Sequence, residues 1–279
     1  MNGTVITICS LKHKDVWRLT SEALIRFVTA SEYIVYVPEV ERSEFERITG
    51  KAITIRSQED LSVEFGENLS MKVSQAQNTE RHGWYLQQFL KIEALLRCEN
   101  ERAVIWDADC VPLKEIKLFD SEGKVRYMSA SEFNPHYFDL IYKILGLPRT
   151  HNHSFVIPGF PVYTTWIKEF ADFLSGRYQM MPWHSVLMDN VDFRLRSGFS
   201  ETETMGTWIV SRYSEMCSTS EYNWERSGQS KFGYARNFSL DKLISRAHEA
   251  NEVDIVTFEN WDLRGVKLFV NKLRAKLWG

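Results

Sequence analysis

Short apolar runs alternate with amphipathic segments along the first half of the chain. The runs are rich in β-branched and aromatic residues, which favours strands at residues 5–9, 33–37, 52–55 and 103–106. Apolar residues at helical spacing lie between them, at residues 16–28, 43–48 and 80–98. This alternation predicts an α/β protein with a mixed, mostly parallel central sheet that is flanked by helices. Ligands of such sheets bind beyond the carboxyl ends of the strands.

The rest of the chain has a less regular pattern. Residues 56–79 are polar and predict no regular element. The pattern beyond residue 110 predicts a strand at 125–130, an extended segment at 154–163 and helices at 137–145, 164–174 and 201–210. Ser200 directly precedes the last of these helices, in the position where a serine caps the first turn. We find no internal repeat and no Gly/Ser-rich linker, so one continuous domain is predicted.

Composition narrows the classes of function. The 34 basic and 37 acidic residues give a net charge of −3, which argues against a general nucleic-acid binder. The four cysteines form no C-x-x-C pair, which excludes a zinc ribbon and indicates a reducing compartment. The opening residues do not fit a cleavable signal peptide, and we expect no membrane-spanning helix.

Two acids follow the apolar run at residues 103–106. Asp107 and Asp109 are spaced i and i+2, and in an extended chain such side chains share one face. Paired carboxylates supply the hard oxygen ligands that Mg²⁺ or Mn²⁺ prefers. Such an ion can take diphosphate oxygens and stabilise a departing nucleotide diphosphate. A D-x-D pair also occurs by chance at turns, and that alternative stays open at this point.

The predicted helix at 80–98 has an unusual polar side. One large aromatic residue, two amides and a cation cluster there, and no acid on the helix is placed to pair with the cation; they are Trp84, Gln87, Gln88 and Lys91. One interpretation is an ordinary solvated helix face. The other is the wall of a site, in which Lys91 would meet phosphate or carboxylate and the amides would meet sugar hydroxyls.

Three segments together resemble a known family. They are Gly83-Trp84-Tyr85-Leu86-Gln87-Gln88-Phe89-Leu90-Lys91, the Asp107-Ala108-Asp109 triplet about 16 residues later, and Phe199-Ser200-Glu201-Thr202-Glu203-Thr204-Met205-Gly206. This combination is similar to bacterial glycosyltransferase-like proteins, known mainly as a domain of unassigned function within the GT-A superfamily. The resemblance implies a GT-A-like domain over residues 1–215, with a nucleotide-binding half at 1–115 and an acceptor half at 116–215. A helical extension at 216–279 follows.

The resemblance also implies an activity. It is the metal-dependent transfer of a sugar from a nucleotide diphosphate donor, with a UDP-sugar as the first candidate, to a glycan or lipid-linked glycan in bacterial surface polysaccharide synthesis. In similar enzymes the first strand and its loop hold the nucleotide and the D-x-D pair holds the metal. The residues implied for donor binding are Ser10, Lys12, Asp15, Trp84, Gln87, Gln88, Lys91 and Asp107. Those implied for binding Mn²⁺ or Mg²⁺ are Asp107 and Asp109, and those implied for catalysis are Glu201 and Glu203.

Geometry separates the two candidate catalytic acids. On a helix that begins after Ser200, Glu201 and Glu203 diverge by about 200°, so only one can point into the site. We favour Glu201, which directly follows the capping serine, and we expect the other acid to cap the helix or to pair with a surface cation. The helix dipole is expected to lower both pKa values. The alternative is that both acids serve only as favourable charge at a helix start.

Two further features have open interpretations. His151, His153 or His184 could complete the metal shell, although a lone histidine is more often a surface or core residue. Residues 266–278 form a basic amphipathic pattern that either packs on the protein itself or lies in a membrane interface. The membrane alternative fits a cytoplasmic protein at the inner face of the cell membrane.

Two rival functions compete with glycosyl transfer. Asp107-Ala108-Asp109-Cys110-Val111 also matches the nucleophile motif of haloacid-dehalogenase-type phosphatases, and Asp189 and Asp192 could mimic their late acidic motif. That nucleophile normally follows the first strand of its domain, whereas three predicted strands precede Asp107. The second rival is a non-catalytic sugar-nucleotide-binding domain, against which the intact Lys91, Asp107 and Asp109 argue.

Overall fold

A five-stranded sheet forms the centre of the protein. The computed structural model describes residues 3–249 and 252–259, and its main sheet has the order β3-β2-β1-β4-β7. The strands are β1 (Thr4–Ile8), β2 (Glu32–Val37), β3 (Thr54–Ser57), β4 (Arg102–Trp106) and β7 (Gly159–Tyr163). The first four run parallel, and β7 runs antiparallel to β4. The predicted fold class, a mixed and mostly parallel sheet flanked by helices, is therefore confirmed.

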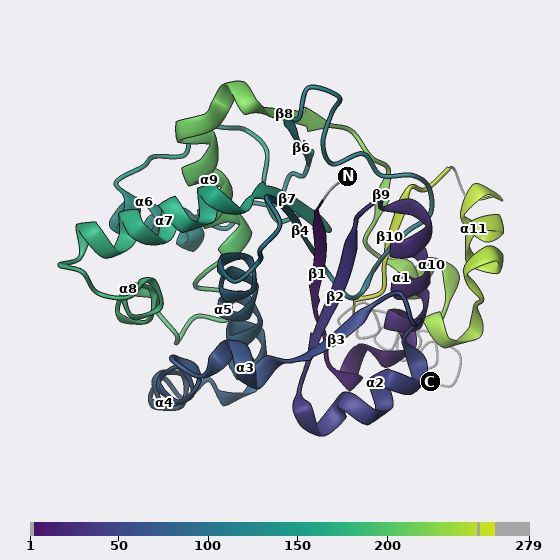
Figure 1. Cartoon of the computed structure of the whole chain (residues 1–279), viewed down its shortest axis with the longest axis horizontal. Coiled ribbons are helices and arrows are strands. Elements are labelled where there is room, and N and C mark those ends of the chain that lie inside the picture. The colour runs from purple at the N-terminus through teal and green to yellow at the C-terminus, as the bar shows by residue number, and fades with distance from the viewer. Residues whose placement is uncertain (1–2, 250–251, 260–279) are drawn as a thin grey trace, which may run out of the picture.

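Helices cover the sheet from two sides (Figure 1). One group contains α3 (Gln58–Ser62), α4 (Gly66–Gln75), α5 (His82–Leu96), α6 (Pro135–Leu145), α7 (Thr164–Arg177), α8 (Trp183–Asn190) and α9 (Glu201–Tyr213). The other contains α1 (Lys14–Phe27), α2 (Arg42–Ile48), α10 (Gly228–Phe232) and α11 (Leu240–Glu249). The two central strands, β1 and β4, are buried almost throughout because helices lie on both of their faces. None of these helices combines the length and the apolar composition that a membrane crossing requires, within the described part of the chain.

The region predicted to lack regular structure is helical. Residues 56–79 contain α3 and α4, so that expectation is wrong. Ser57 caps α3 by accepting a hydrogen bond from the Glu59 amide. Leu61, Phe65, Leu69 and Val73 are buried at a spacing of four residues through α3 and α4. This helical spacing is present in the sequence, but polar residues separate its members and it was not recognised.

Strands beyond residue 215 pair with strands that precede it. β8 (Cys217–Ser220) runs parallel to β6 (Val125–Met128). β10 (Ile255–Thr257) lies between β5 (Cys110–Pro112) and β9 (Trp224–Glu225). Leu240 and Leu243 of α11 pack with Val16 and Leu19 of α1 in one apolar cluster. The predicted extension thus contributes to the same fold, while the predicted helix at 266–278 lies outside the described residues.

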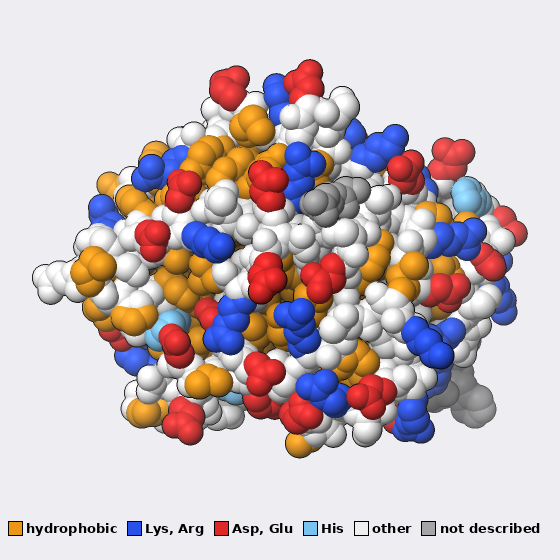
Figure 2. Space-filling model, in the orientation of Figure 1, with side chains coloured by type: hydrophobic (Ala, Val, Ile, Leu, Met, Phe, Trp, Pro, Cys, Tyr) orange, Lys and Arg blue, Asp and Glu red, His pale blue; other side chains and the backbone are white. Residues whose placement is uncertain are grey.

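Charges of both signs are interspersed on the face shown in Figure 2. Acidic and basic side chains lie next to each other across its middle, and apolar side chains are visible between them. The described side chains of this face form no continuous basic surface of the kind that a nucleic-acid backbone requires.

Candidate functional site

The two acids of the D-x-D segment occupy a tight turn at the carboxyl end of β4. The Asp107 amide donates to the carbonyl of Pro158 over 2.9 Å, and the Cys110 amide donates back to the carbonyl of Asp107 over 3.1 Å. The indole of Trp106 closes the turn by donating to the carbonyl of Cys110 over 2.8 Å. The expectation that Asp107 and Asp109 share a face through extended geometry is therefore wrong, because a turn brings these acids together instead.

A glycine makes room for the tryptophan behind this turn. Trp106 is fully buried, and Gly159 of β7 lies opposite it in the sheet. A Cβ atom at Gly159 would come within 2.5 Å of the Trp106 ring, which is closer than two atoms can approach. The turn depends on this close packing, since the indole nitrogen of Trp106 is one of its hydrogen-bond donors.

The C-terminal part of the chain holds the same turn from the other side. The Phe258 amide donates to the carbonyl of Asp109 over 2.9 Å. The hydroxyl of Thr257 lies 3.0 Å from the sulfur of Cys110, and the indole of Trp224 donates to that hydroxyl over 2.7 Å. No site residue beyond 215 is predicted from the sequence, because no local pattern marks these residues as neighbours of Asp109.

Lys91 lies between two carboxylates. Its Nζ atom is 2.7 Å from Oδ1 of Asp107 and 2.7 Å from Oε1 of Glu201. The exposed fraction is 9% for the Lys91 side chain and 6% for that of Glu201, whereas Asp107 keeps 35%. We call these three residues the Lys91 cluster. The absence of a pairing acid on the helix itself was read correctly from the sequence, but the expectation of an unpaired cation is wrong, because both acids come from other elements.

Electrostatics hold Lys91 charged. Burial acts to lower the pKa of Lys91, but Asp107 and Glu201 outweigh it and raise the pKa well above its usual value. A buried ammonium with two carboxylates at hydrogen-bond distance is a strong charge-assisted arrangement. The open side of this cluster is Asp107, which is its most exposed member.

Asp109 carries the remaining negative charge of the turn. Burial and the nearby charge of Asp107 raise the pKa of Asp109 to about 6. The thiol of Cys110 lies 3.6 Å from Oδ1 of Asp109. Burial and the charge of Asp109 also raise the pKa of the Cys9 thiol, directly after β1.

The donor set fits a hard divalent cation held mainly by substrate and water. Among the described residues, no group of three or more His, Cys, Asp or Glu side chains is arranged to hold a metal ion. Asp107 and Asp109 nevertheless place two carboxylates at one turn, where their negative charges repel each other. Mg²⁺ is commonly bound by one or two carboxylates together with phosphate oxygens and water, and this pair suits that mode.

The loop after β1 lies at the same edge of the sheet. Ser10 precedes a short 3₁₀ turn at Leu11–His13, and Lys12 and Asp15 are exposed. His13, which sequence analysis did not single out, also belongs here. Burial and the charge of Lys12 lower the pKa of His13, while the charge of Asp107 acts in the opposite direction. Its position just after the first strand was the signal that could have identified it.

The polar side of α5 connects neighbouring elements. The Gln87 side chain donates to the carbonyl of Ile8 over 3.3 Å. The buried Gln88 accepts from the Glu201 amide over 3.2 Å, and its Nε2 atom has no hydrogen-bond partner among the described residues. Trp84 is half-buried, with the guanidinium of Arg81 4.3 Å from its ring centroid. The solvated-face interpretation therefore fails for Gln88 and Lys91, which are both buried.

The two acids of α9 face different parts of the structure. Ser200 caps the helix as predicted, with its hydroxyl accepting from the Glu203 amide over 3.2 Å. Glu201 joins the Lys91 cluster, whereas Glu203 accepts from the Ser154 hydroxyl over 2.7 Å and from the Phe155 amide over 3.0 Å. Burial raises the pKa of Glu203. Glu203 thus neither caps the helix nor pairs with a surface cation, and burial overrides the pKa decrease expected from the helix dipole.

The candidate histidines have other partners. Nδ1 of His151 is 2.7 Å from the carbonyl of His153, and its Nε2 is 3.3 Å from the Thr207 hydroxyl. Nε2 of His184 lies 3.6 Å from Glu64. Burial lowers the pKa of both His151 and His153. These contacts direct the rings to loops and helices away from the D-x-D turn.

The acids proposed to mimic the late motif of a phosphatase are surface ion pairs. Asp189 lies 2.8 Å from Nζ of Lys72, and Asp192 lies 2.7 Å from the guanidinium of Arg194. Their side chains are 50% and 37% exposed. Neither acid shares a contact with the Lys91 cluster.

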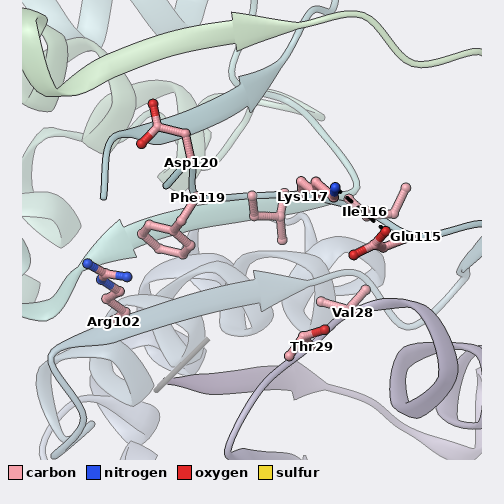
Figure 3. A pocket seen from close by; sticks show the side chains of 9 residues that line it. Val28, Thr29, Arg102, Glu115, Ile116, Lys117, Phe119 and Asp120 are labelled. Carbon is pink, nitrogen blue, oxygen red and sulfur yellow. Dashed lines mark ion pairs between the residues drawn. The ribbon is translucent and has the colours of Figure 1, made fainter. Parts of the chain in front are cut away.

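A cavity of about 280 Å³ lies at the opposite edge of the sheet (Figure 3). It is lined by Arg102, the first residue of β4, by Val28 and Thr29 before β2, and by residues 115–120. The length of β4, roughly 16 Å for five residues, separates it from the Asp107 turn. This cavity is therefore a region separate from the candidate site.

Fold and site together define an α/β protein with a charged site at the carboxyl ends of parallel strands. The chain belongs to a family of unknown function, DUF6492, whose model matches residues 9–223 and so includes the whole Lys91 cluster. No curated protein matches the chain. Among solved structures, the chain is similar to mouse xyloside xylosyltransferase 1 in its apo form. That match has a TM-score of 0.48 and 12% identity, and it covers 93% of this chain and 98% of the other.

Proposed function

We propose that this protein is a metal-dependent glycosyltransferase that uses a nucleotide diphosphate sugar, with a UDP-sugar as the first candidate. The observation that carries the proposal is the convergence of Asp107, Asp109 and the Lys91 ammonium at the carboxyl edge of a mostly parallel sheet. Ligands of such sheets bind at this edge, and a diphosphate there needs positive charge from a metal ion and a side chain. The three sequence segments that resemble glycosyltransferase-like proteins all contribute residues to this site.

The residues of the site take different roles in donor binding. In the proposal, Asp107 and Asp109 hold Mn²⁺ or Mg²⁺, which when bound would neutralise charge on the departing diphosphate. Lys91 orients the diphosphate as a fixed cation. Ser10, Lys12, His13 and Asp15 line the nucleotide side, because they follow β1 directly at the carboxyl edge of the sheet. Gln87 binds the end of β1, and Gln88 binds the start of α9. Trp84 lies on α5 with these two amides.

Glu201 is the one of the two candidate acids that we place in the site. Of the two candidates it alone contacts the Lys91 cluster, where it holds the ammonium that faces Asp107. It is therefore a positioning residue for Lys91, and Glu203 instead holds residues 154–155 against α9. The acceptor in this proposal is a glycan or lipid-linked glycan that approaches from the side of α9.

Binding of nucleotide diphosphates tests the proposal directly. UDP, GDP and CDP, each with and without Mn²⁺, are added to the wild-type protein and the melting temperature is measured. A ligand that binds only the folded state raises it by mass action. We expect one diphosphate with Mn²⁺ to give the largest rise, the Asp109→Asn variant to lose the Mn²⁺-dependent part, and the surface control Asp189→Asn to retain it.

The rival functions give different results in the same samples. If no diphosphate raises the melting temperature, or if Asp109→Asn behaves as the wild type, the proposal is wrong. Release of phosphate from simple phosphate esters that disappears in Asp107→Asn would favour a phosphatase. Diphosphate binding without any turnover of a nucleotide sugar or transfer to an acceptor would favour a non-catalytic domain.

A further inference from the structure

An aromatic pair and an arginine form a compact surface group between β6 and the start of α9. The rings of Phe133 and Phe138 stack with a centroid distance of 5.5 Å and an interplanar angle of 17°. The guanidinium carbon of Arg149 lies 4.9 Å from the centroid of each ring. Phe133 is 59% exposed, so a large part of this side chain is open to solvent. We call these three residues the Arg149 platform.

The charge of Arg149 has no acidic partner. Among the described residues Arg149 enters no ion pair, and its Nε atom is buried without a hydrogen-bond acceptor. Because this Nε atom is enclosed, an anion from solvent would meet the other guanidinium nitrogens of Arg149. A nearby arginine shows the usual solution, since Arg226 lies 2.8 Å from Glu132 and 3.0 Å from Glu259.

The platform is linked to the start of α9 through one short segment. Five and six residues after Arg149, the Ser154 hydroxyl and the Phe155 amide bind the carboxylate of Glu203. The charge of Arg149 acts on Glu203, whose pKa it lowers against the larger effect of burial. Glu203 follows Glu201 by two residues at the start of α9. The platform thus adjoins the face of α9 that carries Glu203, and in this inference the acceptor extends over that face.

We propose that the Arg149 platform binds an acidic sugar of the acceptor, with the sugar ring against Phe133 and its carboxylate or phosphate on Arg149. The planar guanidinium presents donors in a fork that matches these two anions, and a neutral sugar offers no such partner. The inference rests on the proposed function, because it assigns the platform to the acceptor of that reaction.

Three monosaccharides test the inference. Glucuronate, glucose 6-phosphate and glucose are titrated into the full-length protein, and each dissociation constant is measured by ligand-observed NMR at pH 7.5. We expect the wild type to bind at least one acidic sugar about tenfold or more tightly than glucose. The better of the two acidic probes identifies the anion as carboxylate or phosphate.

Variants separate the platform from general charge effects. Arg149→Gln should remove the preference for acidic sugars, while Phe133→Leu should weaken all three sugars alike. Arg212→Gln is the matched control, since Arg212 also lies beside two aromatic rings, Phe173 and Trp208, but at the far end of α9. It should retain the preference.

Two results would overturn the inference. One is equal binding of acidic and neutral sugars by the wild type, and the other is an acidic preference that survives in Arg149→Gln. Binding of UDP with Mn²⁺ is measured in the same samples. If UDP binds and the acidic preference is absent, only the platform is wrong; if the preference is present and no nucleotide diphosphate binds, only the proposed function is wrong.

Discussion

The Lys91 cluster and the Arg149 platform surround a cationic side chain in opposite ways. Lys91 has two carboxylates at 2.7 Å, whereas the guanidinium of Arg149 rests on two phenylalanine rings and meets no acid among the described residues. In the first arrangement the cation has two acidic partners within the protein. The second has no acidic partner among the described residues, and in our inference the anion of a bound sugar supplies it. The paired charges hold the residues of the Lys91 cluster in place, whereas the unpaired charge of Arg149 indicates the kind of ligand that we infer.

The largest effect on stability is expected when the ion pairs of the Lys91 cluster are broken. Lys91→Met leaves Asp107 and Glu201 without their shared cation, and the loss of one partner of a buried pair costs about 3–5 kcal/mol of unfolding free energy. Urea denaturation measures this loss. The control is Lys72→Met, which breaks an exposed pair with Asp189 and should cost about 0–1 kcal/mol. Similar losses in both variants would show that the cluster contributes no more than a surface pair.

The next effect separates the two acids of α9. With a nucleotide sugar and acceptor in hand, Glu201→Gln should reduce turnover about a hundredfold or more, in the range of acid–base and positioning roles, and it should also weaken donor binding because Glu201 holds Lys91 in place. Glu203→Gln should instead destabilise the fold by about 1–3 kcal/mol, because it disturbs the buried contacts with Ser154 and Phe155. Steady-state kinetics and urea denaturation are measured for both. Near-wild-type turnover in both variants would place the catalytic function elsewhere.

A pH titration of stability tests the raised pKa of Asp109, which lies in the same turn as Asp107 of the Lys91 cluster. Its pKa of about 6 in the folded protein lies above the usual aspartate value, so the folded state binds this proton more tightly than the unfolded state. The contribution of Asp109 to stability is therefore fully present below about pH 4 and is lost as pH rises to about 6. We expect Asp109→Asn to remove this part of the pH dependence of the unfolding free energy, measured in metal-free buffer. An unchanged pH profile in the variant would contradict the assignment.

The smallest effect is expected at the opposite edge of the sheet. Arg102 lies 5.3 Å from the ring centroids of both Phe119 and Tyr163 beside the cavity of about 280 Å³. Arg102→Gln should reduce stability by about 1 kcal/mol, the order of an exposed cation–π contact, and leave diphosphate binding unchanged. Urea denaturation and the melting-temperature assay report the two quantities. Loss of diphosphate binding in this variant would move the candidate site to the cavity.

The outline of the fold could be predicted because its signals are local. Strand and helix periodicities located β1, β2, β4 and α5, and Ser200 marked the start of α9. Their alternation indicated a parallel sheet, and the position of Asp107 and Asp109 after a buried strand indicated its functional edge. Each of these signals depends on residues within one or two turns of each other.

The partners within the site could not be predicted in this way. Glu201 reaches Lys91 across 110 residues, Glu203 reaches Phe155 across 48, and Thr257 meets Cys110 across 147. The period of a helix specifies which face a side chain occupies, and it says nothing about which distant segment will cover that face. Burial and pairing depend on the packing of all elements together, which is why the sequence alone gave the positions of the charges and only the tertiary structure decided which of them are neutralised.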